Sequence, residues 1–303
     1  MRFDGRTVVV TGAGGGLGRE YALLLASRGA HVVVSDNGSA PTDGSGESAV
    51  PAEAVVQEIR TAGGEAVSYT EDLSNEAGAR GVVEAAISAY GRIDALVHNA
   101  SFAPLPEDVD QVSTDVFSRM LHVNTFAAFW MVSSAWRRML DQGGGRIVLT
   151  SSSSIFGSPA SLAYSTAKAS VLGMGRSLAA AGGAHNILTN VVVPTAATRL
   201  TTRLPASELK WLNDNFRADQ VAAVVGFLCH EECQLNGEFI TSTGGRIGRV
   251  RLLETLGDIG ENSTIEEVQE RMPAVISQTD HFFPTDPRSR SHKVAHLMGF
   301  VDE

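Results

Sequence analysis

Short runs of apolar residues alternate along the chain with longer segments in which apolar residues recur at helical spacing. The short runs predict buried strands at Thr7–Val10, His31–Ser35, Ala66–Tyr69, Ala95–His98, Arg146–Thr150, Ile187–Val193 and Glu238–Thr241. The longer segments predict helices at Leu17–Arg28, Ala77–Tyr90, Val112–Leu140 (one helix or two), Ala160–Ala181 and Asp219–His230. Strands separated by such helices indicate a single α/β domain, a doubly wound parallel sheet of about seven strands.

Two segments fall outside this alternation. Residues 37–51 (NGSAPTDGSGESAVP) are rich in Gly, Ser and Pro, which predicts a surface loop. Residues 246–303 form a C-terminal extension with one helical stretch, Ile265–Arg271, and beyond it prolines that favour an extended path. We therefore expect a domain at residues 1–245 and an extension at 246–303 that packs on the same domain or on a neighbouring subunit.

Composition narrows the class of protein. The chain has 303 residues, of which 43% are hydrophobic, and a net charge of −10. This acidic balance disfavours nucleic acid or an anionic membrane surface as a partner, because both reward clustered positive charge. The two cysteines exclude a disulfide framework and favour reduced thiols in the cytoplasm. No apolar run approaches the roughly 20 residues of a membrane span, and no signal peptide is expected.

A glycine-dense stretch, TGAGGGLG, follows the first strand directly and opens the first helix. Gly12, Gly16 and Gly18 would let the backbone turn tightly and approach a pyrophosphate at the helix N-terminus, as in a Rossmann fold. Asp36 ends the second strand, where a carboxylate accepts hydrogen bonds from an adenosine ribose and repels a 2′-phosphate. The cofactor predicted is therefore NAD, and the alternative is a helix-capping turn with an unrelated surface Asp.

Tyr164 and Lys168 are spaced i, i+4 and therefore lie on one helix face. A phenol that takes a proton from an alcohol at neutral pH needs a pKa lowered by about 3 units, which a cation about 4 Å away can supply. We expect Lys168 to be that cation. The serine run at 151–154 offers a hydroxyl to hold a substrate oxygen, and Asn124 offers an amide for a bound water. On sequence alone, these residues can equally be ordinary hydrogen-bonding residues of a loop and a helix.

For three other clusters of residues we prefer a structural interpretation to a functional one. Cys229, His230 and Cys233 read as packed thiols rather than a zinc site, and His292 with His296 lacks a partner at metalloprotease spacing, so no metal is expected. Aromatic residues at helical spacing favour core and a subunit interface, which agrees with a homodimer or homotetramer; they are Phe126, Phe129, Trp130 and Trp136.

Taken in order, the glycine stretch, Asp72-Leu73, Asn99-Ala100, Asn124, the serine run and Tyr164-Ser-Thr-Ala-Lys168 resemble the short-chain dehydrogenase/reductase family over nearly the whole chain. The resemblance implies a catalytic tetrad of Asn124, Ser152, Tyr164 and Lys168. Tyr164 would be the acid/base, Ser152 would orient the substrate, Lys168 would hold the nicotinamide ribose, and Asn124 would serve the proton relay. It also implies a set of cofactor contacts, namely Gly12, Gly16, Leu17, Gly18, Asp36, Asp72, Leu73, Asn99, Ala100, Ser101, Tyr164, Lys168, Pro194, Thr195 and Thr198.

The chain departs from the family pattern in three places. The usual Asn-Asn-Ala-Gly is His98-Asn99-Ala100-Ser101 here, and the Pro-Gly beneath the nicotinamide is Pro194-Thr195. The usual count back from the tyrosine selects Ser151 as the catalytic serine, whereas alignment of the strand end selects Ser152. We prefer Ser152, because the strand determines its direction.

Three places are similar to the dehydrogenase unit of the peroxisomal multifunctional β-oxidation enzymes: the long loop after Asp36, the segment 228–233, and the segment 243–249 with 254–257. That unit oxidises (3R)-hydroxyacyl-CoA thioesters and 17β-hydroxysteroids with NAD. The unit is expected to stand alone here. We expect an NAD-dependent enzyme that oxidises a secondary alcohol, with a 3-hydroxyacyl-CoA as leading substrate and a steroid or other bulky alcohol as the alternative. The alternative of another class is an NAD-sensing protein without turnover. Residues 195–216 would form a lid, and its basic residues would meet CoA phosphates or form a solvated face; they are Arg199, Arg203 and Lys210, with Arg217 beside them.

Overall fold

The computed structural model describes residues 1–303 apart from 41–43, 47, 105–107, 197–205, 262–263 and 301–303. The chain divides into two compact units, Met1–Arg249 and Val250–Glu303, and each is described by itself. Among the described residues, no helix combines the length and the apolar character needed to cross a membrane.

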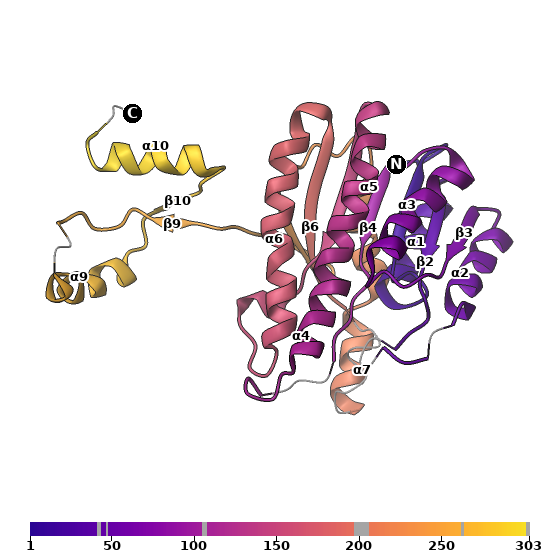
Figure 1. Ribbon diagram of the computed structural model, residues 1–303, viewed down its shortest axis with the longest axis horizontal. Coiled ribbons are helices and arrows are strands. Elements are labelled where there is room, and N and C mark those ends of the chain that lie inside the picture. Colours follow the sequence, from indigo (N-terminus) through magenta and orange to yellow (C-terminus); the bar gives the residue numbers. More distant parts are fainter. Residues whose placement is uncertain (41–43, 47, 105–107, 197–205, 262–263, 301–303) are drawn as a thin grey trace. The chain divides into compact units, whose positions relative to one another are not determined.

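An eight-stranded sheet forms the centre of the first unit, with the strand order β3-β2-β1-β4-β5-β6-β7-β8 (Figure 1). Its first seven strands pair in parallel, and all eight have these bounds: β1 Thr7–Thr11, β2 His31–Ser35, β3 Glu65–Tyr69, β4 Ala95–His98, β5 Gly145–Thr150, β6 Ile187–Thr195, β7 Phe239–Thr243 and β8 Arg246–Val250. Gly244 and Gly245, both at positive φ, join β7 to β8, which makes this pair a hairpin and therefore antiparallel.

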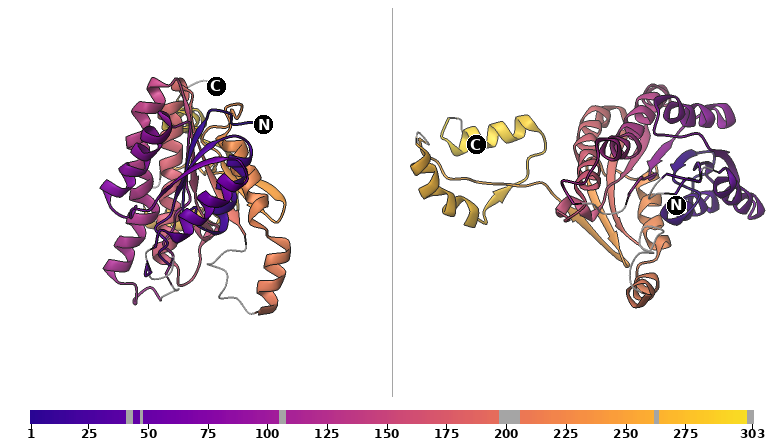
Figure 2. Two further views of the ribbon diagram at one scale, coloured as in Figure 1. Left: turned by 90° about the vertical axis from the view of Figure 1, so that its right-hand side faces the viewer. Right: turned by 60° about the horizontal axis from the view of Figure 1, so that its bottom comes forward.

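Helices cover both faces of the sheet, as the turned view in Figure 2 shows. On one face α1 (Gly16–Ser27) packs against α2 (Val50–Thr61) and α8 (Ala218–Cys229). On the other face lie α3 (Glu76–Tyr90), α4 (Thr114–Leu121), α5 (Ala127–Asp141) and α6 (Leu162–Gly182). The central strands are buried on both faces; Val8, Val9 and Val10 have no exposed surface, for example. This two-sided burial is why the strands read as continuous apolar runs, and it confirms the predicted doubly wound parallel sheet.

Several helices and strands of the structure differ from the sequence prediction. The loop predicted up to residue 51 ends earlier, because α2 begins at Val50 and places Pro51 in its first turn, where proline is tolerated. Within the segment expected to be a lid lies helix α7 (Ala206–Asn215), and β8 was not predicted. The helix predicted at residues 112–140 is α4 and α5 joined by a π-helical turn, His122–Phe126.

The second unit contains a two-stranded antiparallel pair, β9 (Glu254–Thr255) and β10 (His281–Phe282), and helices α9 (Ile265–Ser277) and α10 (Pro287–Leu297). The extended path predicted beyond Pro273 is wrong. Pro273 lies inside α9, and Pro287 opens α10 behind the capping residue Asp286. The boundary after residue 245 and the packing of the extension on the domain or on a neighbouring subunit stay predictions.

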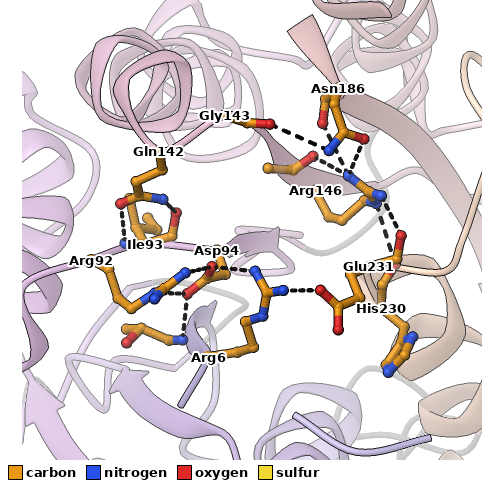
Figure 3. Close-up of polar contacts among 12 residues, drawn as sticks. Arg6, Arg92, Ile93, Asp94, Gln142, Gly143, Arg146, Asn186, His230 and Glu231 are labelled. Carbon is orange, nitrogen blue, oxygen red and sulfur yellow. Dashed lines mark hydrogen bonds and ion pairs between the residues drawn. The ribbon is translucent and has the colours of Figure 1, made fainter. Parts of the chain in front are cut away.

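A charged network closes the amino ends of the strands in the first unit (Figure 3). Asp94 accepts hydrogen bonds from Arg6 at 3.0 Å, from Arg92 at 2.7 Å and from the backbone N–H of Thr7 at 2.9 Å. Within the described residues, the buried Arg146 side chain beside it donates to oxygens without formal charge, those of Gly145, Asn186, His230 and the Glu231 backbone. The network joins the starts of β1, β4, β5 and β6 to the segment that follows α8.

Candidate active site

A pocket of about 470 Å³ opens at the opposite edge, where the parallel strands end. It lies beside the point between β1 and β4 at which the strand order reverses, the usual ligand site of such sheets. Most of the predicted cofactor and catalytic residues line it, namely Gly12, Gly16, Leu17, Asp36, Asp72, Leu73, Asn99, Ala100, Ser101, Ser152, Tyr164, Lys168, Pro194 and Thr195. Gly18 and Asn124 are not part of this lining. Thr198, Arg199 and Arg203 lie outside the described residues.

A side chain has no room at Gly12 in the glycine loop after β1 or at Gly18 in the first turn of α1. Gly12 has φ +65°, and a Cβ there would lie 2.9 Å from Cα of Ala100. A Cβ on Gly18 would lie 2.2 Å from the carbonyl oxygen of Gly12. The first turn of α1 can therefore lie directly against the loop, and its N-terminus faces the pocket through Gly16 and Leu17. Such a cradle of N–H groups fits the pyrophosphate of a dinucleotide.

Thr11 and Asn99 lock the end of β4 to this loop. The hydroxyl oxygen of Thr11 accepts from the backbone N–H groups of Asn99 and Ala100, both at 3.0 Å. The Asn99 amide donates back to the carbonyl of Thr11 at 3.0 Å. Asn99 thus positions the glycine loop as well as lining the pocket.

Asp36 holds a carboxylate at the end of β2, where the sequence predicted the adenosine ribose. Its two oxygens accept from the backbone N–H groups of Gly14 at 2.9 Å and Gly38 at 2.7 Å, and the residue is only 9% exposed. Each oxygen keeps further lone pairs, so the carboxylate can still accept from a ribose diol. Asp72 is also placed by local bonds, from the N–H and the hydroxyl of Ser74.

Arg119 is a pocket residue that sequence reasoning missed. It comes from α4, donates to the carbonyl of Gly44 at 3.5 Å, and holds its guanidinium 4.9 Å from the ring centre of Phe102. Gly44 is 75 residues away in the chain, and no motif links the two. No Arg or Lys lies between Arg28 and Arg60, the stretch of sequence around Asp36. The fold nevertheless brings the guanidinium of Arg119 to the pocket that Asp36 lines.

Tyr164 and Lys168 share one face of α6, as their spacing predicted. Lys168 is 1% exposed, donates to the carbonyl of Thr150 at 3.2 Å, and has its ammonium 5.7 Å from the centre of the Tyr164 ring. Burial lowers the pKa of Lys168 to about 7. Burial also raises the pKa of Tyr164, against the opposing hydrogen bonds of Ser152 and Ser101. Because burial acts in the opposite direction, the expectation that Lys168 lowers the pKa of the phenol stays a prediction.

The two serines after β5 have different surroundings. Ser151 is buried and donates its hydroxyl to the carbonyl of Lys168 at 2.7 Å. Ser152 caps the short 3-10 turn Ser153–Phe156, accepting from the N–H of Ser154 at 3.2 Å, and its hydroxyl faces the Tyr164 phenol. Only the geometry of Ser152 therefore suits a donor to the same substrate oxygen that Tyr164 reaches.

Asn124 lies in the π-helical turn between α4 and α5, a feature often found at functional sites. Its buried amide donates to the carbonyls of Phe102 at 2.8 Å and Met120 at 3.0 Å, and its oxygen accepts from the Ser101 hydroxyl at 2.7 Å. Asn124 is therefore joined to the pocket through Ser101, whose side chain replaces the glycine of the family pattern.

His98, the other departure in this motif, is a buried neutral ring. Burial, with a smaller contribution from the charge of Lys168, lowers its pKa to about 3. The ring contacts the Thr11 hydroxyl at 3.2 Å on one side and faces the backbone of Val123 and Asn124 on the other. His98 thereby ties the ends of β1 and β4 to the π-helical turn.

The cysteines predicted to be packed thiols lie in the core cluster formed with α1 and α8. Cys229 and Cys233 are both buried and free, and burial raises the pKa of each thiol. Within the described part of the chain, no group of three or more His, Cys, Asp or Glu side chains is arranged to hold a metal ion.

A family model described as short chain dehydrogenase matches residues 6–208. With this match and the relatives below, the chain belongs to the short-chain dehydrogenase family and is an oxidoreductase that acts on CH–OH groups. It is 40% identical, over 100% of its length, to mouse peroxisomal multifunctional enzyme type 2 and covers 41% of that protein. The solved full-length peroxisomal multifunctional enzyme type 2 of Drosophila melanogaster matches with a TM-score of 0.81 at 31% identity, over 99% of this chain and 50% of that one.

A third similar structure bears on the cofactor. A 7α-hydroxysteroid dehydrogenase complexed with NADH matches with a TM-score of 0.71 at 29% identity, over 80% of this chain and 97% of that one. This likeness agrees with a nicotinamide dinucleotide as the cofactor class. The chain thus spans about half the length, or less, of its multifunctional relatives, and nearly all of the 7α-hydroxysteroid dehydrogenase chain.

Proposed function

We propose that the protein oxidises a secondary alcohol to a ketone with NAD, reversibly, and that its leading substrate is a 3-hydroxyacyl-CoA. One observation supports the chemistry above all. The Tyr164 phenol faces the Ser152 hydroxyl in a pocket that also contains Lys168 and the glycine loop. An acid/base, an oxygen-holding donor and a dinucleotide cradle thus open into one space.

The roles of the side chains follow from their contacts. The Ser152 hydroxyl would donate to the substrate oxygen, while the phenolate form of Tyr164 takes the hydroxyl proton. Lys168, held by the Thr150 carbonyl, would hold the ribose next to the nicotinamide and pass the proton onward. Asn124 would keep the relay in place from the π-helical turn. NAD, when bound along the glycine loop, supplies the hydride acceptor.

We propose NAD rather than NADP because of Asp36. The carboxylate is fixed by two backbone N–H groups and lines the pocket, so a 2′-phosphate placed there would meet a like charge at close range. The Asp36→Asn variant keeps the shape and removes the charge. We expect its kcat/KM preference for NAD over NADP to fall by at least about tenfold. An unchanged preference in steady-state assays with both cofactors would leave selection to other residues.

The substrate proposal rests on the relatives and on the pocket wall. The chain is similar over its whole length to multifunctional peroxisomal enzymes, and apolar side chains line the pocket near Tyr164, among them Phe102, Leu162 and Ala163. An apolar wall suits an acyl chain. It also suits a steroid, and the likeness to a hydroxysteroid dehydrogenase keeps that alternative.

The test is NADH formation with purified protein, NAD, and a panel of 3-hydroxyacyl-CoAs, hydroxysteroids and small alcohols. Turnover of thioesters alone would support the leading substrate, and turnover of steroids alone would replace it. Tyr164→Phe is the matched variant, because it removes only the phenol oxygen. We expect it to lose about 10²-fold or more in kcat while NAD binding is retained. Turnover at the wild-type rate would overturn the acid/base assignment.

The assembly and the compartment are proposals of the same kind. Phe126, at the end of the π-helical turn, and Phe129 of α5 are 42% and 50% exposed, and such neighbouring exposed aromatic residues favour a subunit interface. We propose a homodimer or homotetramer, which light scattering of the full chain would measure. The free thiols favour a reducing compartment, which we take to be the cytoplasm, although the relatives named above are peroxisomal. Fractionation of cells that express the tagged chain distinguishes the two.

A further inference from the structure

Ser101 lies between two members of the predicted tetrad. It follows β4 at the carboxyl edge of the sheet and lines the same pocket as Tyr164, Ser152 and Lys168. Its hydroxyl donates to the amide oxygen of Asn124 at 2.7 Å, and it lies near enough to the phenol of Tyr164 to lower the pKa of that group. The glycine of the family pattern has no side chain to make either contact.

The Asn124 amide depends on this serine. Both hydrogens of its nitrogen are used, by the carbonyls of Phe102 and Met120, and the residue has no exposed surface. Ser101 supplies the hydrogen bond to the amide oxygen. Because a buried acceptor without a donor is costly, the pair Ser101–Asn124 holds the Ser101 oxygen at a defined place beside the phenol.

The neighbours of Ser101 make this place rigid. Phe102 packs with Met120, Ala163 and Ala167 in one buried cluster, and Tyr164 packs against that cluster. The residue that follows Ser101 is therefore held by the same buried cluster against which Tyr164 packs. The hydroxyl hydrogen of Ser101 can still rotate about the Cβ–Oγ bond.

That hydrogen has two possible acceptors, and the charge of Tyr164 decides between them. A hydroxyl has one hydrogen and two lone pairs. While Tyr164 is a neutral phenol it can donate to the Ser101 oxygen, and Ser101 donates to Asn124. A phenolate can only accept, and a hydrogen bond to a charged acceptor is about twice as strong as one to a neutral acceptor. Rotation of the Ser101 hydroxyl away from the Asn124 oxygen therefore brings the phenolate a second donor beside Ser152. Such a rotation takes picoseconds to nanoseconds, and no proton leaves the serine.

We propose that Ser101 is a further catalytic residue, whose hydroxyl stabilises the Tyr164 phenolate and whose oxygen receives the hydrogen of the neutral phenol. This inference rests on the proposed role of Tyr164 as acid/base. It assigns to a residue outside the tetrad a contact with the oxygen that exchanges the proton.

The consequence is a displaced pH profile. Loss of a donor to a charged group shifts its equilibrium by about tenfold or more, which is about one pKa unit. Without Ser101 the phenol pKa rises, so less phenolate is present at a given pH. Alcohol oxidation needs the phenolate, and the rising limb of kcat/KM against pH therefore moves to higher pH by about one unit. Ketone reduction needs the phenol, and its falling limb moves in the same direction.

The variants are Ser101→Ala, which removes the hydroxyl, and Ser101→Thr, which retains it. Ser118→Ala, at an exposed position on α4, is the control. We expect the limb to move by about one unit in Ser101→Ala, to return in Ser101→Thr, and to stay in Ser118→Ala. The NAD dissociation constant of Ser101→Ala should stay within about threefold of wild type. A weaker binding of NAD with an unmoved limb would make Ser101 part of the cofactor floor and overturn the proposal.

A second readout does not require turnover. The chain has four tyrosines, so NMR of isotope-labelled tyrosine Cζ, assigned with Tyr164→Phe, reports the ionisation of Tyr164 directly in the NAD complex. A pKa that rises in Ser101→Ala supports the role of Ser101 even when no alcohol in the panel is a substrate. An unchanged pKa overturns it, whatever the activity shows. Failure of the proposed function alone would appear as silence of the wild type with the spectroscopic shift intact.

Discussion

Lys168 serves the proposed reaction, but the burial of its ammonium lowers the stability of the folded protein. Burial lowers its pKa to about 7, whereas an unfolded lysine has a pKa of about 10.4. Between these values the unfolded state binds more protons, so the contribution of Lys168 to the unfolding free energy rises with pH from about 7 to about 10. Below about pH 7 both states are protonated, and the folded protein bears the full cost of a buried ammonium.

Lys168→Met should therefore be more stable than the wild type at neutral pH, by about 3 kcal/mol, and inactive. Its advantage should shrink as pH rises towards 10, because the wild type then buries a neutral amine. Urea unfolding of both proteins at several pH values measures the difference. Lys210→Met, which removes an exposed lysine of α7, is the control and should show no such trend. A difference that is independent of pH would mean that burial does not lower the pKa of Lys168.

The site residues that can be predicted from the sequence are those whose geometry is determined by a single helix or strand. Tyr164 and Lys168 share a helix face because they are four residues apart, and Asp36 reaches the pocket because β2 ends there. Ser101 and Asn124 are 23 residues apart and meet only through the packing of β4 against the π-helical turn. Their contact, the place of Arg119 and the direction of the Tyr164 pKa shift arise from burial, which no local pattern encodes.

The glycines of α1 and α6 offer a matched pair at the scale of the helix. A Cβ on Gly18 would lie 2.2 Å from the Gly12 carbonyl oxygen, a backbone atom, whereas a Cβ on Gly173 would meet nothing within 4 Å. Both glycines are helical, so alanine gives each the same gain of helix propensity, up to about 1 kcal/mol. We expect Gly173→Ala to be neutral or slightly stabilising, and Gly18→Ala to lose about 1–3 kcal/mol as the loop is displaced.

The same displacement should weaken the dinucleotide site, because the loop carries the N–H groups that face a pyrophosphate. Titration of protein fluorescence with NAD should give a dissociation constant raised by about tenfold or more in Gly18→Ala and unchanged in Gly173→Ala. Equal stability and equal affinity in the two variants would mean that the first turn of α1 can move away from the glycine loop without cost.

At the same scale, the alternation of strands and helices was predictable and the helix starts with proline were not. The strands of the parallel sheet are apolar on both faces, so β2 and β4 were found with their observed ends. The sequence predicts a loop at Pro51 and an extended path at Pro287, although each stands in the first turn of a helix, where its missing N–H costs nothing. Proline has both meanings, and the capping bond of Asp286 that decides between them is visible only in the structure.

The two edges of the sheet have different roles: the carboxyl edge carries the candidate active site, and the amino edge stabilises the fold. The carboxyl edge holds the pocket, with buried groups such as Lys168 whose burial is costly, while at the amino edge Asp94 is paired with Arg6 and Arg92. Arg6 also forms an ion pair with Glu231 in the segment after α8 (Figure 3). The network therefore joins the start of the first unit to a segment 225 residues later in the chain. Stability gained there can offset the cost of the site without altering its geometry.

Asp94 tests this division of labour. Burial acts to raise its pKa, but hydrogen bonds from Arg92, the Thr7 N–H and Arg6 outweigh burial and hold the pKa below its usual value. Such a carboxylate stabilises the fold above the unfolded pKa of about 3.9, and this stability is lost as pH falls through the folded pKa. Asp94→Asn should therefore unfold about 2 kcal/mol more easily at pH 7, by urea titration, with a deficit that shrinks below about pH 4. Asp4→Asn, which breaks an exposed pair with Arg2, is the control and should change nothing measurable. Folded Asp94→Asn should keep wild-type kcat; a deficit that persists unchanged in acid, or a loss of kcat per folded molecule, would contradict the separation of the two edges.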